Sequence, residues 1–370
     1  MKIGFDVSHI QKTRAGIGQH TYQLLKALIS ADDTNEYILH GWSLGINKQA
    51  IAHVAHDSTK LSVRRIPGAV KRFYWNKLRL PRIESLLGEI DVFHSSDPFL
   101  PPTMGRTICT VHDLAYKKFP ELLERKVVRD DRFVRRSVNL ADAVIVPSQQ
   151  TKLDLIEIMD VDRNKIHIVN VPPSPIFSSA KSESDVKVKE KFSLAKPYIL
   201  FVGTVEPRKN IPSIVKAFET VPDRIDLVLV GKKGWHTEES LGSIESSSAK
   251  ARIHYLEYVT DEELASLYRR ALCFVYPSFY EGYGFPLLEA MASGIPIITS
   301  NNSSMREIAD GVALLVSPSS VGDIAEAMNM LVSDEVRRVE MRQRGMHIVE
   351  QYTAERAAKS VLNIYNSLAS

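Results

Sequence analysis

Residues 276–291 read YPSFYEGYGFPLLEAM, and this stretch decides the fold. The apolar run Leu272 to Tyr276 leads into it and predicts a buried strand. Pro286 suits the first position of a helix, where its missing N–H costs nothing, and Gly294 is placed to end that helix. Two glycines make the loop between strand and helix flexible and bare of side chains. The stretch therefore predicts a helix N-terminus with backbone N–H groups ready to bind a phosphate.

Two carboxylates frame this loop. Glu281 lies at its start, and Glu289 lies one turn into the predicted helix. A carboxylate beside an anion site is electrostatically unfavourable unless it binds hydroxyl groups, such as those of a ribose or another sugar. Two glutamates at this spacing alone would be typical of a solvated helix face, so the argument depends on the whole motif.

The full pattern, Pro-Ser-x-x-Glu-Gly-x-Gly-x-Pro-x-x-Glu-Ala-Met, resembles the signature of the family 4 retaining glycosyltransferases. The resemblance covers nearly the whole chain. It implies the α/β architecture called GT-B, two Rossmann-like domains whose parallel sheets face across a cleft. It also implies a nucleotide-sugar donor, with Glu289 on the ribose hydroxyls and Glu281 near the transferred sugar as a catalytic residue. The other donor contacts in this loop would be Gly282, Tyr283, Gly284, Phe285, Pro286 and Leu287.

A second motif, GTVEPRKN at residues 203–210, lies between a predicted strand and a predicted helix. Arg208 and Lys209 place two cations beside a helix N-terminus, which suits a diphosphate. The motif resembles the family signature Gly-x-x-Glu-Pro-Arg-Lys-Asn, whose basic residues bind the donor pyrophosphate. Both are therefore predicted catalytic residues that stabilise the leaving diphosphate. Many relatives carry an arginine directly after the first glycine, whereas here Thr204 follows Gly203.

Short apolar runs alternate with amphipathic helices in both halves of the chain, which predicts parallel sheets covered on both faces. Polar residues follow three of the runs in the first half, at 95–97, at 112–113 and at Ser148. Ligands gather at such strand ends. His112 is either a structural histidine or a functional one. In the related enzymes a histidine at this strand end contacts the donor sugar, and we therefore predict that His112 is catalytic.

Gly16 and Gly18 lie between the first predicted strand and the first predicted helix. A dinucleotide fingerprint would need a third Gly or Ala where this chain has Thr21. The pair fits either a tight structural turn or a substrate-binding loop, and we include both glycines among the predicted substrate contacts. Further predicted contacts in the second half are Gly234, and Tyr258 and Val259, whose backbone would touch the nucleobase.

The composition, 370 residues of which 44% are hydrophobic, supports two domains with cores of their own. The proline- and serine-rich segment 172–185 is the best boundary. We predict an acceptor-binding domain at 1–175, a nucleotide-sugar-binding domain at 176–350, and a C-terminal helix at 351–370 that packs back on the first domain. Cys109 and Cys273 are expected to be buried thiols in a reducing compartment. The chain has no signal peptide pattern and no apolar run of membrane-spanning length, so we expect a cytoplasmic protein.

The net charge of +3 hides an asymmetry. Residues 1–180 hold 25 Lys and Arg against 19 Asp and Glu, a net charge of +6, and residues 181–370 hold 22 against 25, a net charge of −3. Basic residues in the stretches 71–82 and 117–136 are interleaved with aromatic and apolar ones. Such a surface suits an anionic membrane, which predicts a peripheral position on the inner face of the cell membrane, but a solvated helix face is equally consistent. No nucleic-acid-binding motif is present.

No metal or other cofactor is expected. Asp160 and Asp162 have the Asp-x-Asp spacing that the other large glycosyltransferase fold uses for a divalent ion, but they lie in a predicted turn without other acids. Family membership implies retention at the anomeric carbon, although no residue can be assigned as a nucleophile.

The forms of the motifs, with His112 followed by Asp113, resemble bacterial mannosyltransferases of surface-polysaccharide assembly. The first guess is therefore transfer of a hexose, mannose from GDP-mannose, to a saccharide or lipid-linked saccharide. The alternatives are a nucleotide-sugar epimerase of the same fold and a non-catalytic protein that binds a nucleotide-sugar.

Overall fold

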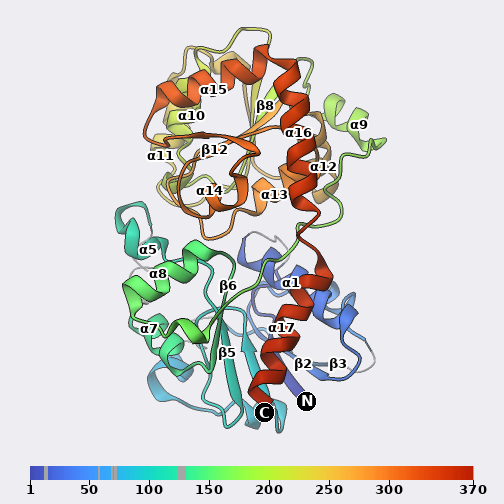
Figure 1. Cartoon of the computed structure of the whole chain (residues 1–370), viewed down its shortest axis with the longest axis vertical. Coiled ribbons are helices and arrows are strands. Elements are labelled where there is room, and N and C mark those ends of the chain that lie inside the picture. Colours follow the sequence, from blue (N-terminus) through green and yellow to red (C-terminus); the bar gives the residue numbers. More distant parts are fainter. Residues whose placement is uncertain (12–15, 57–58, 68–69, 71–72, 124–130, 370) are drawn as a thin grey trace. The chain divides into compact units, whose positions relative to one another are not determined.

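Two parallel sheets organise the chain in a computed structural model (Figure 1). The structure describes residues 1–11, 16–56, 59–67, 70, 73–123 and 131–369. Contacts divide the chain into two units, each built around one sheet. Unit 1 comprises Met1–Lys117, Lys126–Pro172 and Tyr352–Ser370, and unit 2 comprises Lys118–Arg125 and Pro173–Gln351.

The described part of unit 1 contains seven parallel strands in the order β3-β2-β1-β4-β5-β6-β7. The order reverses at β1 and β4, and α/β proteins commonly bind ligands beyond the carboxyl ends of two such strands. The five inner strands are mostly apolar and buried on both faces, as a parallel sheet between helices requires, whereas the edge strands β3 and β7 are only partly covered. The seven strands are β1 (Lys2–Asp6), β2 (Glu36–Trp42), β3 (Thr59–Arg64), β4 (Val92–Ser95), β5 (Arg106–Thr110), β6 (Ala143–Val146) and β7 (Ile166–Ile168).

Helices connect the strands of unit 1, and the first of them begins at the glycine pair. Gly18 is in α1, where an added Cβ would lie 2.5 Å from the carbonyl oxygen of His9, so the helix can approach the preceding loop only with glycine. The described helices are α1 (Ile17–Ala31), α2 (Lys48–Ala52), α4 (Glu84–Leu87), α5 (Ala115–Lys118), α7 (Asp131–Leu140), α8 (Gln149–Met159) and α17 (Ala354–Ala369), with a π-helix at Phe73–Leu78 and a 3-10 turn at Arg163–Lys165.

Helix α17 packs against α1 although the whole of unit 2 separates them in the sequence (Figure 1). Tyr365 of α17 is fully buried, and its hydroxyl lies 2.7 Å from Nδ1 of His94 in β4. Nε2 of His94 lies 3.4 Å from Oγ1 of Thr110. Burial lowers the pKa of His94 to about 3, so the ring is neutral and needs these neutral partners. The C-terminal helix is thus part of the core of unit 1.

The described part of unit 2 contains six parallel strands in the order β10-β9-β8-β11-β12-β13, with the reversal at β8 and β11. The strands are β8 (Tyr198–Val202), β9 (Asp226–Val230), β10 (Ile253–Leu256), β11 (Cys273–Tyr276), β12 (Ile297–Ser300) and β13 (Ala313–Val316). The described helices are α9 (Ser184–Lys191), α10 (Ile211–Phe218), α11 (Glu238–Ser246), α12 (Asp261–Arg270), α13 (Phe285–Ala292), α14 (Ser303–Ala309), α15 (Val321–Ser333) and α16 (Glu335–Val349), with 3-10 turns at Pro120–Leu122, Pro207–Lys209 and Lys250–Arg252.

Local signals set the ends of the helices in unit 2. Pro286 is in the first turn of α13, and Gly294, with φ +66°, follows the end of that helix as predicted. Thr260 caps α12 in a capping box with Glu263. Cys109 and Cys273 are free and buried, which confirms that both are buried thiols.

The basic aromatic stretch 71–82 is only partly a surface. Phe73 and Tyr74 are 47% and 42% exposed, but Trp75 is 1% exposed and stacks on Trp42 of β2 with ring centroids 5.2 Å apart. Trp75 therefore belongs to the core and not to the predicted basic aromatic surface, because β2 supplies an aromatic partner for it. Lys71, Arg72 and residues 124–130 of the second basic stretch lie outside the described residues. None of the described helices has the length and hydropathy that crossing a bilayer would require.

Replacing Tyr365 by Phe tests whether α17 is fastened through its hydroxyl. The change leaves Nδ1 of His94 buried without its partner, so the free energy of unfolding should fall by roughly 1–3 kcal/mol. Urea unfolding followed by circular dichroism and tryptophan fluorescence would measure it. Tyr258→Phe is the matched control, because that ring is 70% exposed. Identical midpoints for Tyr365→Phe and the parent would contradict the assigned role.

Candidate active site

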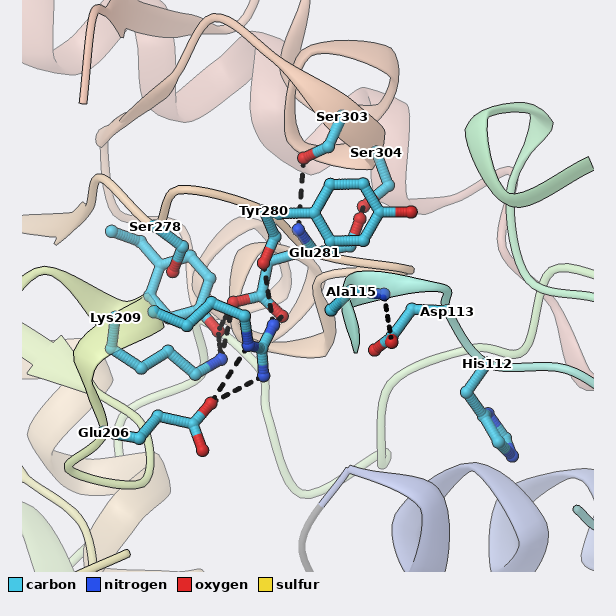
Figure 2. A network of polar contacts seen from close by, with 12 residues as sticks. His112, Asp113, Ala115, Glu206, Lys209, Ser278, Tyr280, Glu281, Ser303 and Ser304 are labelled. Carbon is cyan, nitrogen blue, oxygen red and sulfur yellow. Dashed lines mark hydrogen bonds and ion pairs between the residues drawn. The ribbon is translucent and has the colours of Figure 1, made fainter. Parts of the chain in front are cut away.

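The site is assembled from the loops that follow β8 and β11, the neighbouring strands at which the order of the unit 2 sheet reverses (Figure 2). The first loop carries Glu206, Arg208 and Lys209, and the second carries Glu281. Parallel strands end at the same edge of a sheet, so the two motifs come together although about 70 residues separate them.

Glu281 is the centre of a buried polar network. Its Oε2 accepts a hydrogen bond from Nη1 of Arg208 at 2.7 Å, and its Oε1 accepts one from Nζ of Lys209 at 2.5 Å. The hydroxyl of Tyr276 lies 3.0 Å from the same Oε1. Arg208 also donates to Oε1 of Glu206, through Nε at 3.1 Å and Nη2 at 2.7 Å. Glu281 and Lys209 are each 7% exposed, so these charges neutralise one another largely away from water.

The two cations decide the ionisation of Glu281. Burial would raise its pKa, but the charges of Arg208 and Lys209 outweigh burial and lower the pKa to about 2. For Lys209 burial dominates and, with the charge of Arg208, lowers the pKa. We expected an acid at an anion site to require hydroxyl ligands. The structure gives Glu281 a different role, because its charge is balanced by the cations of the other motif.

Side chains also fix the backbone of the loop. Five successive carbonyl oxygens, from Pro277 to Glu281, each accept a hydrogen bond from a side chain. The donors are Asn210 and Arg208 from the β8 loop, and Ser300, Asn302 and Ser304 from β12 and the start of α14. The glycines led us to expect a flexible loop. The structure shows one held in place along its first half, and its residues 280–285 are all buried.

The pKa of Glu289 is shifted in the opposite direction from that of Glu281. It is 8% exposed on α13, and its Oε2 accepts a hydrogen bond of 3.0 Å from the hydroxyl of Tyr268 on α12. Burial raises its pKa to about 7; Tyr268 opposes that shift and Asp261 adds to it. The ring of Tyr268 in turn packs edge-on against Phe177, with centroids 5.6 Å apart. Glu289 is therefore a buried carboxyl group with one neutral partner, able to accept further hydrogen bonds.

Gly203, Thr204 and Gly234 form a tight corner beside this network. A Cβ on Gly234 would lie 2.8 Å from Cγ2 of Thr204 and 2.8 Å from the carbonyl oxygen of Val205, and a Cβ on Gly231 would lie 1.9 Å from the carbonyl oxygen of Gly203. The glycines thus have a packing role. Tyr258 and Val259 lie between β10 and α12, outside the network, and Tyr258 is 70% exposed. Their contact with a nucleobase stays a prediction.

Three of the predicted site residues, His112, Gly16 and Gly18, belong to unit 1. His112 follows β5, and its Nε2 lies 2.9 Å from the carbonyl oxygen of Ser96. Its ring packs edge-on against His20, with centroids 4.9 Å apart, and burial lowers the pKa of His112, so the imidazole is neutral. Gly16 has φ +44° and precedes α1, with open space where a Cβ would point. Backbone conformation at Gly16 and close packing at Gly18 are therefore structural reasons for both glycines.

Sequence reasoning missed three side chains of the site. Glu206 belongs to the second motif but received no role, and Tyr276 was taken only as the end of a strand. Tyr268 had no signal of its own, because an aromatic residue on an amphipathic helix usually belongs to the core. Their partners lie close in the sequence: Glu206 is 2 residues from Arg208, Tyr276 is 5 from Glu281 and Tyr268 is 21 from Glu289. The motifs name residue types and spacing but not which side chains point toward one another.

Asp160 and Asp162 lie in the turn between α8 and β7, as predicted. Asp160 follows α8 in the left-handed conformation, and Oδ1 of Asp162 accepts a hydrogen bond from the N–H of Asn164. These are the usual tasks of aspartate in turns.

Two family models match the chain. The model described as "Glycosyltransferase Family 4" matches residues 14–171, and the model described as "Glycosyl transferases group 1" matches residues 182–347, which include both motifs. The chain belongs to the family 4 glycosyltransferases. O-antigen chain mannosyltransferase B of Escherichia coli is 29% identical over 100% of both chains. O-antigen chain mannosyltransferase RfbU of Salmonella typhimurium is 28% identical over 85% of this chain and 86% of its own.

Solved structures share the fold of this glycosyltransferase. Sucrose-phosphate synthase from Thermosynechococcus elongatus matches 99% of this chain and 98% of its own with a TM-score of 0.80 at 19% identity. WaaG, a glycosyltransferase involved in lipopolysaccharide biosynthesis, matches 98% of this chain and 99% of its own with a TM-score of 0.75 at 14% identity. These likenesses and the two parallel sheets confirm the predicted GT-B architecture.

The two buried glutamates should respond differently to replacement by glutamine. Glu281→Gln removes one of the two carboxylates that balance Arg208 and Lys209 and leaves the buried Lys209 without its ion-pair partner, so the free energy of unfolding should fall by roughly 3–5 kcal/mol. Because the pKa of Glu281 is lowered, its stabilisation is complete above its unfolded pKa of 4.5 and is lost as the pH falls towards 2. The variant should lack this acid-dependent loss.

Glu289→Gln is the matched control, since burial has already raised the pKa of Glu289 to about 7. At pH 6 the amide replaces a mostly protonated carboxyl group, and the change in stability should stay below about 1 kcal/mol. Urea unfolding at pH 6 would compare the two variants. Equal losses would rule out the electrostatic difference between these residues.

Proposed function

We propose that this glycosyltransferase moves a mannosyl group from GDP-mannose to a saccharide or lipid-linked saccharide, with retention at the anomeric carbon. The observation that carries the proposal is the likeness to O-antigen chain mannosyltransferase B over the full length of both chains. A nucleotide-sugar donor also has support from a structural neighbour. HepE of Anabaena, whose TM-score is 0.77 at 15% identity, was solved in complex with UDP-glucose.

The geometry of unit 2 suits a diphosphate leaving group. The N-terminus of α13 and the side chains of Arg208 and Lys209 provide hydrogen-bond donors at fixed positions. The two cations are matched by Glu206 and Glu281, so in formal charges the network is balanced before a ligand arrives. During transfer, negative charge would develop on the leaving diphosphate. The oriented hydrogen-bond donors of the network and of α13 would stabilise that charge.

The state of Glu281 supports transfer without a covalent glycosyl-enzyme intermediate. Its carboxylate oxygens are engaged by Arg208, Lys209 and Tyr276, and its pKa is lowered to about 2, which makes it a weak nucleophile. The alternative to a double displacement is attack from the face that the diphosphate leaves, with a phosphate oxygen accepting the proton of the acceptor hydroxyl. Glu289, close to Tyr268, would accept hydrogen bonds from the ribose hydroxyls.

A panel of nucleotide-sugars tests the donor. Thermal shift and hydrolysis would be measured with GDP-mannose, UDP-glucose, UDP-N-acetylglucosamine and ADP-glucose, and GDP-mannose should give the largest shift and the fastest release of nucleotide. A preference for a uridine donor would overturn the assignment of the base. Release of an epimerised nucleotide-sugar instead would favour the epimerase, although the relatives named above are transferases. A chelator should leave the rate unchanged, and strict dependence on a divalent ion would contradict a metal-free reaction.

Glu289→Gln in the same panel tests the ribose contact. The measurement is made at pH 8, above the pKa of about 7 that burial gives Glu289, so that the carboxyl group is ionised. Hydrogen bonds to a charged group contribute about 1.5–3 kcal/mol, so the affinity for GDP should fall by about one to two orders of magnitude. Glu262→Gln, at an exposed position of α12, is the matched control. Calorimetry that finds the same affinity for both variants would remove Glu289 from the nucleotide site.

We also propose that unit 1 associates with an anionic membrane surface through residues 73–82. Phe73, Tyr74, Leu78 and Leu80 are between 42% and 60% exposed. Arg79 has its pKa lowered by burial and by the charge of Arg136, so one cation of each basic stretch lies close enough to the other to interact. Exposed apolar side chains beside clustered cations fit an anionic leaflet, where each cation contributes about 1 kcal/mol. A lipid-linked acceptor would lie in such a leaflet.

Co-sedimentation with vesicles tests this surface. A variant with Lys77, Arg79 and Arg82 changed to Ser should bind phosphatidylglycerol-containing vesicles about a hundredfold more weakly than the parent. Binding by the parent should also weaken with salt. The matched control changes Lys181, Lys187 and Lys189, exposed positions in unit 2, to Ser. Equal sedimentation of the two triple variants would mean that residues 73–82 form an ordinary solvated surface.

A further inference from the structure

His9 and Asp97 form a pair at the carboxyl edge of the unit 1 sheet. His9 lies three residues beyond β1 and Asp97 two residues beyond β4, and these are the strands at which the sheet order reverses. Nε2 of His9 lies 2.8 Å from Oδ2 of Asp97. The pair thus occupies in unit 1 the kind of position that the network around Glu281 occupies in unit 2.

Asp97 selects the tautomer of His9, that is, which ring nitrogen carries the proton. Its Oδ1 accepts hydrogen bonds from Oγ of Ser95 at 3.1 Å and from the N–H of Phe99 at 3.0 Å, and the residue is 8% exposed. A carboxylate can only accept, so the proton between the two side chains is on Nε2 of His9. In the neutral ring Nδ1 is then a hydrogen-bond acceptor.

The ring of His9 is open to a ligand. Its side chain is 31% exposed, and no hydrogen bond to Nδ1 occurs among the residues that the structure describes. The neighbouring histidines differ. His20 is 2% exposed and packs against His112, whose Nε2 lies 2.9 Å from the carbonyl oxygen of Ser96. Both of those imidazoles have a pKa lowered by burial and are neutral.

Among the described residues, two carboxylates at this edge disfavour a phosphate as the ligand. The carboxylate of Asp97 lies directly against His9, and Asp6, at the end of β1, is also buried there with its Oδ1 accepting from the N–H of Ser8. Two carboxylates repel an anion. A neutral molecule with several hydroxyl groups can instead donate to an imidazole nitrogen.

We propose that His9 binds a hydroxyl group of the acceptor saccharide, which donates a hydrogen bond to Nδ1, and that Asp97 is its positioning residue. This inference rests on the proposed transfer to a saccharide. The site differs from the donor site, because its residues come from β1 and β4 of unit 1 and those around Glu281 and Glu289 come from unit 2.

Binding is tested first without catalysis. The full chain with 15N-labelled histidine is titrated with methyl α-D-mannopyranoside, and imidazole resonances are followed by NMR. The signals of His9 are those that are absent from a His9→Phe variant. They should shift and saturate, and those of the exposed His53 should not. Stationary His9 signals up to the solubility of the glycoside would overturn the inference.

Kinetics give the second readout. With GDP-mannose and octyl α-D-mannopyranoside, His9→Phe should raise the acceptor KM about five- to tenfold. Hydrolysis of the donor without acceptor and the donor KM should stay within about twofold. Asp97→Asn should raise the acceptor KM in the same direction with little change in kcat, a split that a general loss of folding would not produce. His53→Gln is the matched control.

The two experiments distinguish a failure of the proposed role of His9 from a failure of the proposed function. If His9→Phe does not fold, His9→Gln keeps a donor for Asp97 and is measured in its place. An unchanged acceptor KM in a protein that transfers mannose would overturn the role of His9 and leave the proposed function intact. No turnover of GDP-mannose by the parent would overturn the proposed donor, and saturating shifts of His9 would still support a saccharide site in unit 1.

Discussion

The structure of unit 2 depends on one buried carboxylate held between two cations. Glu281 joins the loop after β11 to Arg208 and Lys209 in the loop after β8, and no member of this group could be buried alone at an acceptable cost. The same Arg208 donates to the carbonyl oxygen of Tyr280, so the ion pair also positions the backbone. Electrostatic pairing and backbone hydrogen bonding thus depend on each other, and the motif residues are arranged before any ligand is bound.

One short motif holds two glutamates in opposite states. The charges of Arg208 and Lys209 lower the pKa of Glu281 to about 2, so this group stays ionised far into the acidic range. Burial raises the pKa of Glu289 to about 7. The first group organises the loops that would meet a diphosphate, and the second has spare acceptor capacity for hydroxyl groups. In the proposed function, such a division would let a single strand-loop-helix element serve both ends of a nucleotide: Glu281 would maintain the architecture and Glu289 would contact the ligand.

Local features could be predicted from the sequence, and distant partners could not. Pro286 and Gly294 set the ends of α13 as expected, because the conformations of proline and glycine are local properties. The cationic partners of Glu281 lie 72 and 73 residues away, and Asp97 lies 88 residues from His9. Periodicity shows that a residue is buried but not what it touches. Trp75 illustrates the same limit, because only the fold brings it to Trp42.

The position of α17 has a consequence for synthesis on the ribosome. Unit 1 is composed of residues up to Pro172 and residues from Tyr352, so the whole of Pro173–Gln351 is translated before the last piece of unit 1 exists. Until then the face of α1 that α17 covers is exposed, and Nδ1 of His94 lacks the hydroxyl of Tyr365. Domains usually fold in order from the N-terminus. Here the unit that is started first is completed last, and the nascent chain carries an exposed apolar face while the other sheet forms.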